Sequence, residues 1–198
     1  MKQYWLAAGL VMAPLHAGVL VNGGFEDGLN GWTINQDSGS VSIVSQYVGN
    51  PYTYNPKEGS HFLEIVPGSS RYVVAAQQSV DLSASTKVSG WAGFNKGTEI
   101  DMMEVQVSKD GGATWDQVQY WDSNAYSSVN WTQWNYTATT TGNYTFRFMA
   151  ENIVGSGSKS VGVFDGVTVV PEPGSAAIVG TILLGGVLVK RRFSKQNR

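Results

Sequence analysis

Residues 103–115 read MEVQVSKDGGATW, and this stretch contains the two parts of a β-hairpin. Its first six residues alternate apolar and polar, as in a strand with one face against a core and the other in water. Asp110, Gly111 and Gly112 follow, and these residue types favour tight turns. The stretch therefore predicts a half-buried strand that ends in a turn.

The same period of two recurs in residues 133–136 and 144–148. Further strand candidates, separated by clusters of Gly, Asn, Asp, Ser and Pro, are 41–46, 61–66, 71–80, 87–94, 117–121 and 160–169. No amphipathic helix pattern interrupts them. About nine or ten short strands joined by such turns predict an all-β fold, an antiparallel β-sandwich of the jelly-roll type.

Composition agrees with one domain of this class. The 198 residues are 42% hydrophobic and 12% aromatic, with 24 glycines and no cysteine. Disulfides, thiolate metal sites and thiol catalysis are therefore excluded. Residues 18–170 carry seven basic and 14 acidic side chains, a formal net charge of −7. Without a basic stripe to neutralise phosphates, this domain is not expected to bind nucleic acid.

The N-terminal residues have the pattern of a secretory signal peptide. Lys2 precedes an apolar stretch, and Ala17 offers a small residue at the exit. This order of basic, apolar and small residues is typical of an export signal. We expect residues 1–17 to form its helix and to be cleaved between Ala17 and Gly18, so that residues 18–170 form the exported domain.

The C-terminal residues have the pattern of a membrane anchor. Pro171-Glu172-Pro173 precedes an apolar segment, and Lys190, Arg191 and Arg192 follow it. The prolines disfavour regular structure, so residues 171–173 are expected to be extended. Residues 174–189 are predicted to form a short transmembrane helix. The basic residues place the 190–198 tail in the cytoplasm and the domain outside.

Pro171-Glu172-Pro173, the apolar helix and the Arg-rich end together resemble the PEP-CTERM sorting signal. In that family, an integral-membrane exosortase is thought to recognise the Pro-Glu-Pro motif and process the anchor. The resemblance implies a Gram-negative bacterium that makes exopolysaccharide. It also implies an inner-membrane intermediate, followed by release to the cell surface or the extracellular matrix.

Three stretches of the central domain resemble landmarks of jelly-roll carbohydrate-binding modules of the galactose-binding-like superfamily. Residues 20–32, LVNGGFEDGLNGW, resemble the first strand of these modules. Residues 57–65, KEGSHFLEI, and 163–167, VFDGV, resemble later landmarks. The resemblance implies a sandwich more firmly than it implies a ligand.

The same resemblance implies a structural calcium ion. The matching positions are Gly24, Glu26, Glu58, the carbonyl of His61, and Asp165. Calcium takes carboxylate and carbonyl oxygens, and it would relieve the repulsion among three carboxylates. Asp165 also interrupts the apolar alternation of 161–169 and so needs a partner. The alternative is that these carboxylates point to solvent or accept backbone hydrogen bonds.

Aromatic residues gather in 121–134 among polar neighbours, and sugar rings stack on such side chains. We predict a glycan site that includes Trp121, Tyr126 and Trp131, with Trp121 and Trp131 exposed. Trp134 alternates with Tyr136 and is expected in the core. The alternative is that most of these rings are core residues.

Residues 108–115, SKDGGATW, match the Asp box of sialidases, S-x-D-x-G-x-T-W. In that motif, Asp and Ser/Thr side chains hold a hairpin turn, Gly supplies positive φ and Trp packs beneath. The motif is a folding device remote from active sites, so it predicts a hairpin here and not a catalytic group.

Catalytic groups are scarce. His61 is the single histidine after residue 17, and no Ser/His/Asp arrangement surrounds it. Two sets of carboxylates are close in sequence: Glu58 with Glu64, and Glu99 with Asp101 and Glu104. Either set would serve a glycosidase only if two of its carboxylates faced each other across a cleft. We therefore expect a non-enzyme. The first hypothesis is a surface protein associated with exopolysaccharide, the second is a glycan-binding module with a defined sugar, and the third is a small hydrolase.

Sorting gives the first testable prediction. Replacing Pro171, Glu172 and Pro173 together by alanine should leave export intact but retain the protein unprocessed in the inner membrane, because the motif that the exosortase reads is gone. Fractionation and the mass of the mature protein measure this. If the triple variant reached the surface at the wild-type mature mass, the sorting hypothesis would be wrong.

Overall fold

The computed structural model describes residues 18–170 except 37, 70 and 156. The predicted signal peptide, sorting motif, transmembrane helix and basic tail lie outside the described residues. The described part is all-β, and it contains no helix long and apolar enough to cross a membrane.

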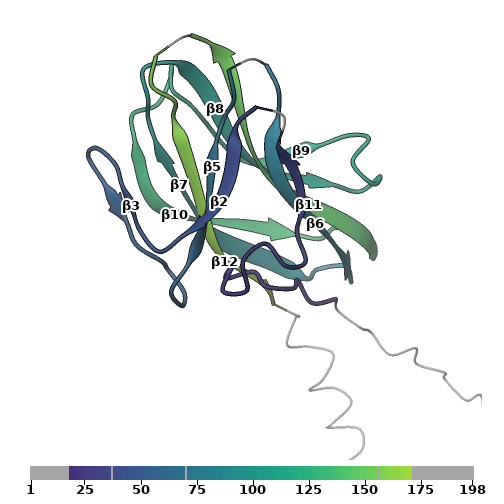
Figure 1. Ribbon diagram of the computed structural model, residues 1–198. Coiled ribbons are helices and arrows are strands. Elements are labelled where there is room, and N and C mark those ends of the chain that lie inside the picture. The colour runs from purple at the N-terminus through teal and green to yellow at the C-terminus, as the bar shows by residue number, and fades with distance from the viewer. Residues whose placement is uncertain (1–17, 37, 70, 156, 171–198) are drawn as a thin grey trace, which may run out of the picture.

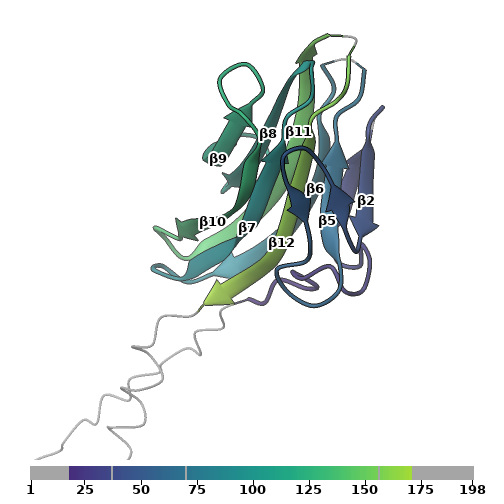
Figure 2. The ribbon, with the colours of Figure 1, turned by 90° about the vertical axis from the view of Figure 1, so that its left-hand side faces the viewer.

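Two five-stranded antiparallel sheets pack face to face (Figures 1 and 2). Sheet I has the order β1-β6-β11-β8-β9. Its strands are β1 (Thr33–Gln36), β6 (Val74–Leu82), β11 (Gly142–Val154), β8 (Ile100–Ser108) and β9 (Asp116–Asp122). The prediction of an antiparallel β-sandwich is confirmed.

Sheet II has the order β10-β7-β12-β5-β2. Its strands are β10 (Val129–Thr137), β7 (Lys87–Asn95), β12 (Val161–Val170), β5 (Phe62–Val66) and β2 (Ser40–Val44). A small hairpin of β3 (Tyr47–Val48) and β4 (Thr53–Tyr54) lies outside sheet II, as both views show. The sequence did not predict β1, β3 or β4, which are too short for a periodic pattern.

Aromatic rings fill the space between the sheets. Phe148 of β11 stacks on Phe164 of β12 with ring centroids 4.8 Å apart, which joins the middle strands of the two sheets. Trp32 and Trp134 pack against Phe148, at 5.3 and 5.9 Å between centroids. Each of these rings is nearly or completely buried, and full burial of one large apolar side chain contributes roughly 2–3 kcal/mol.

The stretch 20–32, which resembles a first strand, forms turns instead, and the first strand is β1. The reason is a side chain that takes the place of a neighbouring strand. Gln78 of β6 accepts a hydrogen bond from the Val21 amide at 2.6 Å and donates one to the Val21 carbonyl at 3.0 Å. These two bonds satisfy the N–H and C=O groups of Val21 without a neighbouring strand. Trp32, at the end of the stretch, is still buried in the core.

A β-bulge divides β12 into two halves that face different ways. The register with β7 shifts between Asp165 and Thr168. Before the bulge, Val161 and Val163 pack outside sheet II; after it, Val167 packs in the main core. The apolar residues of 161–169 therefore do not share one face of the sheet. The prediction that Asp165 interrupts such a shared face is wrong. Asp165 lies on the outer side, where it pairs with Trp91.

The hairpin covers the outer side of sheet II through Tyr54. This ring is completely buried and packs with Phe62, Val161 and Val163 in a second apolar cluster. Its hydroxyl lies 2.9 Å from the Val129 carbonyl oxygen and 3.1 Å from that of Phe94. Burial raises the pKa of Tyr54.

Gly93 makes this close approach possible. A Cβ at position 93 would lie 2.7 Å from Cε1 of Tyr54, closer than side-chain carbons approach in proteins. Glycine is therefore required beneath the ring, and the hairpin can lie directly on the sheet.

Removing the buried hydroxyl tests how the hairpin is held. Tyr54→Phe should lower the free energy of unfolding by about 1 kcal/mol, because the single hydroxyl proton shared between the Phe94 and Val129 carbonyls is lost. Tyr54→Ala should cost about 3 kcal/mol or more, because a cavity is added. Urea denaturation measures both. Tyr72→Phe, at an exposed side chain, is the matched control. Equal midpoints for Tyr54→Phe and wild type would contradict the assigned role of the hydroxyl.

Candidate functional site

The outer face of sheet I carries polar and aromatic side chains that no other strand covers within the described residues. The alternate residues of β6, β8, β9 and β11 point away from the core, and cross-strand pairing places them side by side. The outward-pointing residues near the centre of this face include Gln77, Glu104, Gln106, Tyr120, Arg147 and Glu151. Sheet II lacks such an open face at its centre, because the β3–β4 hairpin lies over it.

Arg147 lies at the centre of this face and organises it. Its Nε donates to Oε1 of Gln106 at 2.8 Å, and its Nη2 contacts the same oxygen. Gln106 in turn donates from Nε2 to Oε2 of Glu104 at 2.6 Å. Burial lowers the pKa of Arg147, and Glu104 opposes that shift. The three side chains thus form one hydrogen-bonded row across β11 and β8.

Several outer-face side chains are buried although they point away from the core. Glu104 is 7% exposed, and Met149 of β11, its cross-strand partner, is 2% exposed. Burial also raises the pKa of Glu151, and the positive charge of Arg71 only partly opposes this rise. The face is therefore a packed polar surface rather than a set of freely solvated side chains.

Aromatic rings border the row along β9. The Arg147 guanidinium lies 3.8 Å from the centroid of the Trp115 ring. Tyr120 donates its hydroxyl to Oδ2 of Asp122 at 2.9 Å, and its ring meets Tyr126 edge to face at 6.4 Å. Burial, followed by the Asp122 contact, raises the pKa of Tyr120 to about 12. The Tyr126 side chain is 42% exposed and so is open to a ligand.

The β8–β9 turn positions Trp115. Asp110 accepts hydrogen bonds from the Thr114 amide at 2.9 Å and the Thr114 hydroxyl at 2.6 Å. These bonds, with one from Ser108, lower the pKa of Asp110 strongly. Gly111 and Gly112 have φ of 72° and 95°, which glycine adopts without strain. The predicted hairpin is confirmed, and it also brings Trp115 beside Arg147.

The predicted glycan residues are not brought together. Trp121 is 4% exposed and stacks on Phe94 in the core, so the prediction that it is exposed is wrong. Its partner across the β8–β9 ladder is Met103, whose side chain points into the core. The sequence of residues 117–121 has no alternation from which the inward direction of Trp121 could be predicted. Trp131 is half-buried: it donates from Nε1 to the Asn55 carbonyl at 2.9 Å and packs under the hairpin. Tyr126 is exposed, and Trp134 is in the core as predicted.

The sequence alone did not predict a role in the site for Trp115, Tyr120, Gln106 or Arg147. Gln106 and Arg147 are the polar members of two alternating strands, so their outward direction was readable. That these two strands are neighbours was not readable, because β8 and β11 are about 40 residues apart in sequence.

The carboxylates expected to bind calcium surround the loop 57–61. Glu26 accepts the amides of Ser60 and His61 through Oε1, at 2.8 and 2.7 Å. The Glu26 carboxylate also lies 3.5 Å from Nδ1 of His61, and the backbone hydrogen bonds lower the pKa of Glu26. Asp165 accepts the amides of Lys57 and Glu58 through Oδ2, at 2.6 and 3.0 Å.

These contacts match the alternative in which the carboxylates accept backbone hydrogen bonds. The Glu58 carboxylate lies beside Gly24 and Gly166, close to the same loop. Among the described side chains, however, no three His, Asp or Glu residues gather closely enough to hold a metal ion. Glu26 and Asp165 both accept backbone amides in this structure, and calcium stays a prediction from the sequence.

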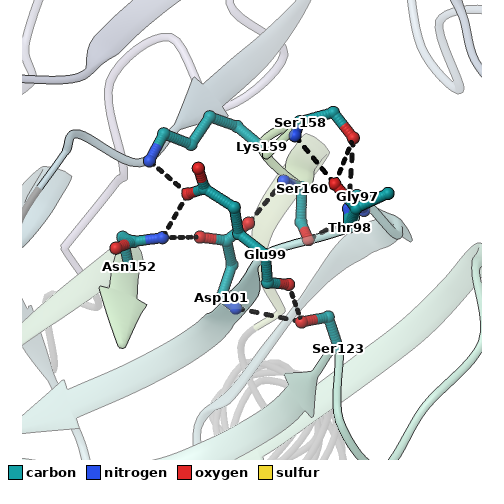
Figure 3. Close-up of polar contacts among 9 residues, drawn as sticks. All are labelled: Gly97, Thr98, Glu99, Asp101, Ser123, Asn152, Ser158, Lys159 and Ser160. Atoms are coloured by element: carbon teal, nitrogen blue, oxygen red, sulfur yellow. Dashed lines mark hydrogen bonds and ion pairs between the residues drawn. The ribbon is translucent and has the colours of Figure 1, made fainter. Parts of the chain in front are cut away.

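Two of the three carboxylates considered for a glycosidase, Glu99 and Asp101, lie at the end of the sandwich where β7 joins β8 and β11 joins β12 (Figure 3). Glu99 is 4% exposed and Asp101 is completely buried. Both accept hydrogen bonds from Nδ2 of Asn152, at 2.5 and 2.8 Å. Lys159 pairs with Glu99, and the Ser160 amide donates to Asp101. Neither carboxylate faces a cleft as glycoside hydrolysis requires.

No protein-family model and no curated protein matches this sequence. Solved structures match it in fold. A family 61 carbohydrate-binding module, TmCBM61, in complex with β-1,4-galactotriose is 20% identical with a TM-score of 0.50, covering 78% of this chain and 99% of that one.

Two further structures show the same likeness. The K3 cleaved adhesin domain of Lys-gingipain from Porphyromonas gingivalis is 12% identical with a TM-score of 0.50, covering 78% of this chain and 98% of that one. A family 16 carbohydrate-binding module is 21% identical with a TM-score of 0.48, covering 77% and 99%. At 20% and 12% identity, the two structures with a TM-score of 0.50 show a shared β-sandwich fold.

Asp165 gives a pH prediction. Burial raises its pKa to about 6, above the value of 3.8 expected in an unfolded chain. The folded state therefore holds the proton more tightly, and this group's stabilisation is lost as the pH rises from about 4 to about 6. Asp165→Asn removes the titrating group and keeps one acceptor oxygen. The wild-type free energy of unfolding should fall by on the order of 2 kcal/mol more than that of the variant across this range.

Urea titrations at each pH in excess chelator measure the difference, with Asp116→Asn, at an exposed side chain on β9, as the control. Parallel curves for wild type and Asp165→Asn would contradict the prediction.

Thermal melts of the wild-type protein in calcium and in excess chelator test the predicted calcium ion. Superimposable curves in calcium and chelator would exclude it, while a rise in Tm that Asp165→Asn lacks would support it.

Proposed function

We propose that this protein is an exported, non-enzymatic glycan-binding protein, and that it binds polysaccharide on the outer face of sheet I. The observation that carries the proposal is the Arg147–Gln106–Glu104 row, bordered by the Trp115, Tyr120 and Tyr126 rings. Sugars present hydroxyls to such amide, guanidinium and carboxylate groups, and their C–H faces stack on aromatic rings.

The fold likeness supports this class of ligand. TmCBM61 carries β-1,4-galactotriose and shares the sandwich fold over most of the chain described here. A defined binding face also favours a glycan-binding module with a saturable site over loose association with a matrix. Glu99 and Asp101 give the hydrolase hypothesis no support, because both are buried and bonded to Asn152.

The proposal includes delivery to the cell surface or the extracellular matrix of a Gram-negative bacterium. It rests on the signal peptide pattern, Pro171-Glu172-Pro173, the apolar segment and the basic tail. These lie outside the described residues, so the exosortase and the membrane remain proposed partners. A secreted exopolysaccharide would then be within reach of the binding face.

Affinity electrophoresis in gels containing host exopolysaccharide or β-1,4-galactan tests the binding face. At least one polysaccharide should retard the wild-type protein. Tyr120→Ala and Tyr126→Ala should each weaken binding about fivefold, because a stacked ring contributes roughly 1 kcal/mol. Trp115 is a poor choice for substitution, since it also packs in the β8–β9 turn.

Gln133→Ala and Asn135→Ala are the matched controls. Both side chains are exposed on β10, in sheet II, so these variants should bind as wild type does. Circular dichroism confirms that each variant folds. If folded Tyr120→Ala and Tyr126→Ala bound as tightly as the controls, or if no polysaccharide retarded the wild type, the proposed site would be wrong.

A further inference from the structure

A lysine, an asparagine and a carboxylate meet in the buried cluster of Figure 3, away from the outer face of sheet I. Asn152 belongs to β11, Glu99 immediately precedes β8, and Lys159 lies two residues before β12. Asn152 is 3% exposed, and the side chain of Glu99 is 2% exposed. The Lys159 side chain is 23% exposed, so most of it is also buried. An amine, a carboxamide and a carboxylate in one largely buried site are the groups that amide exchange between side chains requires.

The contacts place these groups in the order that such a reaction needs. Oε2 of Glu99 accepts a hydrogen bond from Nδ2 of Asn152 at 2.5 Å and also contacts Nζ of Lys159. One carboxylate oxygen thus touches both the amine that would attack and the nitrogen that would leave. A group in that position can pass a proton from the first nitrogen to the second.

Asp101 holds the carboxamide in place. Its Oδ1 accepts from Nδ2 of Asn152 at 2.8 Å, and its Oδ2 accepts from the Ser160 amide at 2.6 Å. The Ser160 amide follows Lys159 directly in the chain. Asp101 therefore fixes the backbone next to the lysine and the side chain of the asparagine relative to each other, which favours reaction by proximity.

We propose that Lys159 and Asn152 form an intramolecular isopeptide bond, with Glu99 as the catalytic residue. Glu99 takes a proton from the Lys159 ammonium, and the neutral Nζ adds to Cγ of Asn152. Glu99 then returns this proton to Nδ2, and the Cγ–Nδ2 bond breaks to release ammonia. The attacking Nζ still carries two hydrogens, and Glu99 passes one of them to the ammonia, which leaves as ammonium. The product is a Lys159–Asn152 amide, and no external reactant is needed. Loss of ammonia makes the step effectively irreversible.

The bond would close the connection between β11 and β12 covalently. Asn152 and Lys159 would be joined at the end of the sandwich away from Val170, so that these two ends of the connection cannot separate. Such a cross-link limits local opening of the connection. An exported protein exposed to proteases would gain kinetic stability at this connection.

Mass spectrometry of the purified full chain tests the proposal. The intact mass should be about 17 Da below that of the processed sequence, because one ammonia is lost. Trypsin should fail to cut after Lys159, since its amine is acylated. Fragmentation of the peptide that begins at Phe148 should give no backbone ions between 152 and 159, because the cross-link keeps both parts together.

Three variants separate this bond from other reactions. Lys159→Arg and Glu99→Gln should restore the full mass, and Lys96→Arg, in the neighbouring connection, should keep the loss. A succinimide at Asn152 also loses ammonia, but it reopens in mild base and leaves cleavage after Lys159 intact. If the folded wild type had the full mass, or if the loss persisted in Lys159→Arg, the proposal would be overturned. The wild-type mass decides the question even if a variant does not fold.

Discussion

The stacking of Phe148 on Phe164 between the two sheets is the contact on which the rest of the structure depends. Each ring lies on the middle strand of its sheet, so this contact fixes which side of β11 and β12 faces inward. Because side chains alternate along a strand, the neighbours of Phe148 must point outward. Arg147 and Met149 therefore belong to the outer face of sheet I. The position of the candidate binding face follows directly from core packing.

The two outer faces of the sandwich differ because one of them is covered. Tyr54, at the end of a short hairpin, packs over Gly93 and bonds to two carbonyls of sheet II. A second apolar cluster forms there, and Trp131 becomes part of it. Sheet I has no such cover among the described residues, so its polar side chains meet one another and solvent. Aromatic residues therefore serve packing on one sheet and border a polar face on the other.

Carboxylates in this domain have distinct structural roles. Asp110 holds a turn, Glu26 and Asp165 hold a loop, and Glu99 and Asp101 join the connections at one end of the sandwich. Backbone or side-chain donors satisfy each of them, because an unpaired buried carboxylate is costly. The acidic composition of residues 18–170 is thus partly structural. Glu104, beside Gln106 and Arg147, is the acidic residue built into the candidate binding row.

The sequence by itself determined the class of fold, because alternation and turn chemistry are local properties. It identified nine of the strands, the hairpin of 108–115, and the burial of Trp134. It did not show that 20–32 forms turns, since Gln78 provides those hydrogen bonds from a distant strand.

Tertiary structure alone decided where the candidate site lies. Trp121 and Tyr120 are adjacent in sequence, yet ladder register sends one into the core and the other to the outer face. Gln106 and Arg147 meet only because β8 pairs with β11. Asn152 and Lys159 come close to Glu99 for the same reason, through strand pairings that join distant parts of the chain. Such contacts depend on strand order and register, and local sequence patterns do not contain that information.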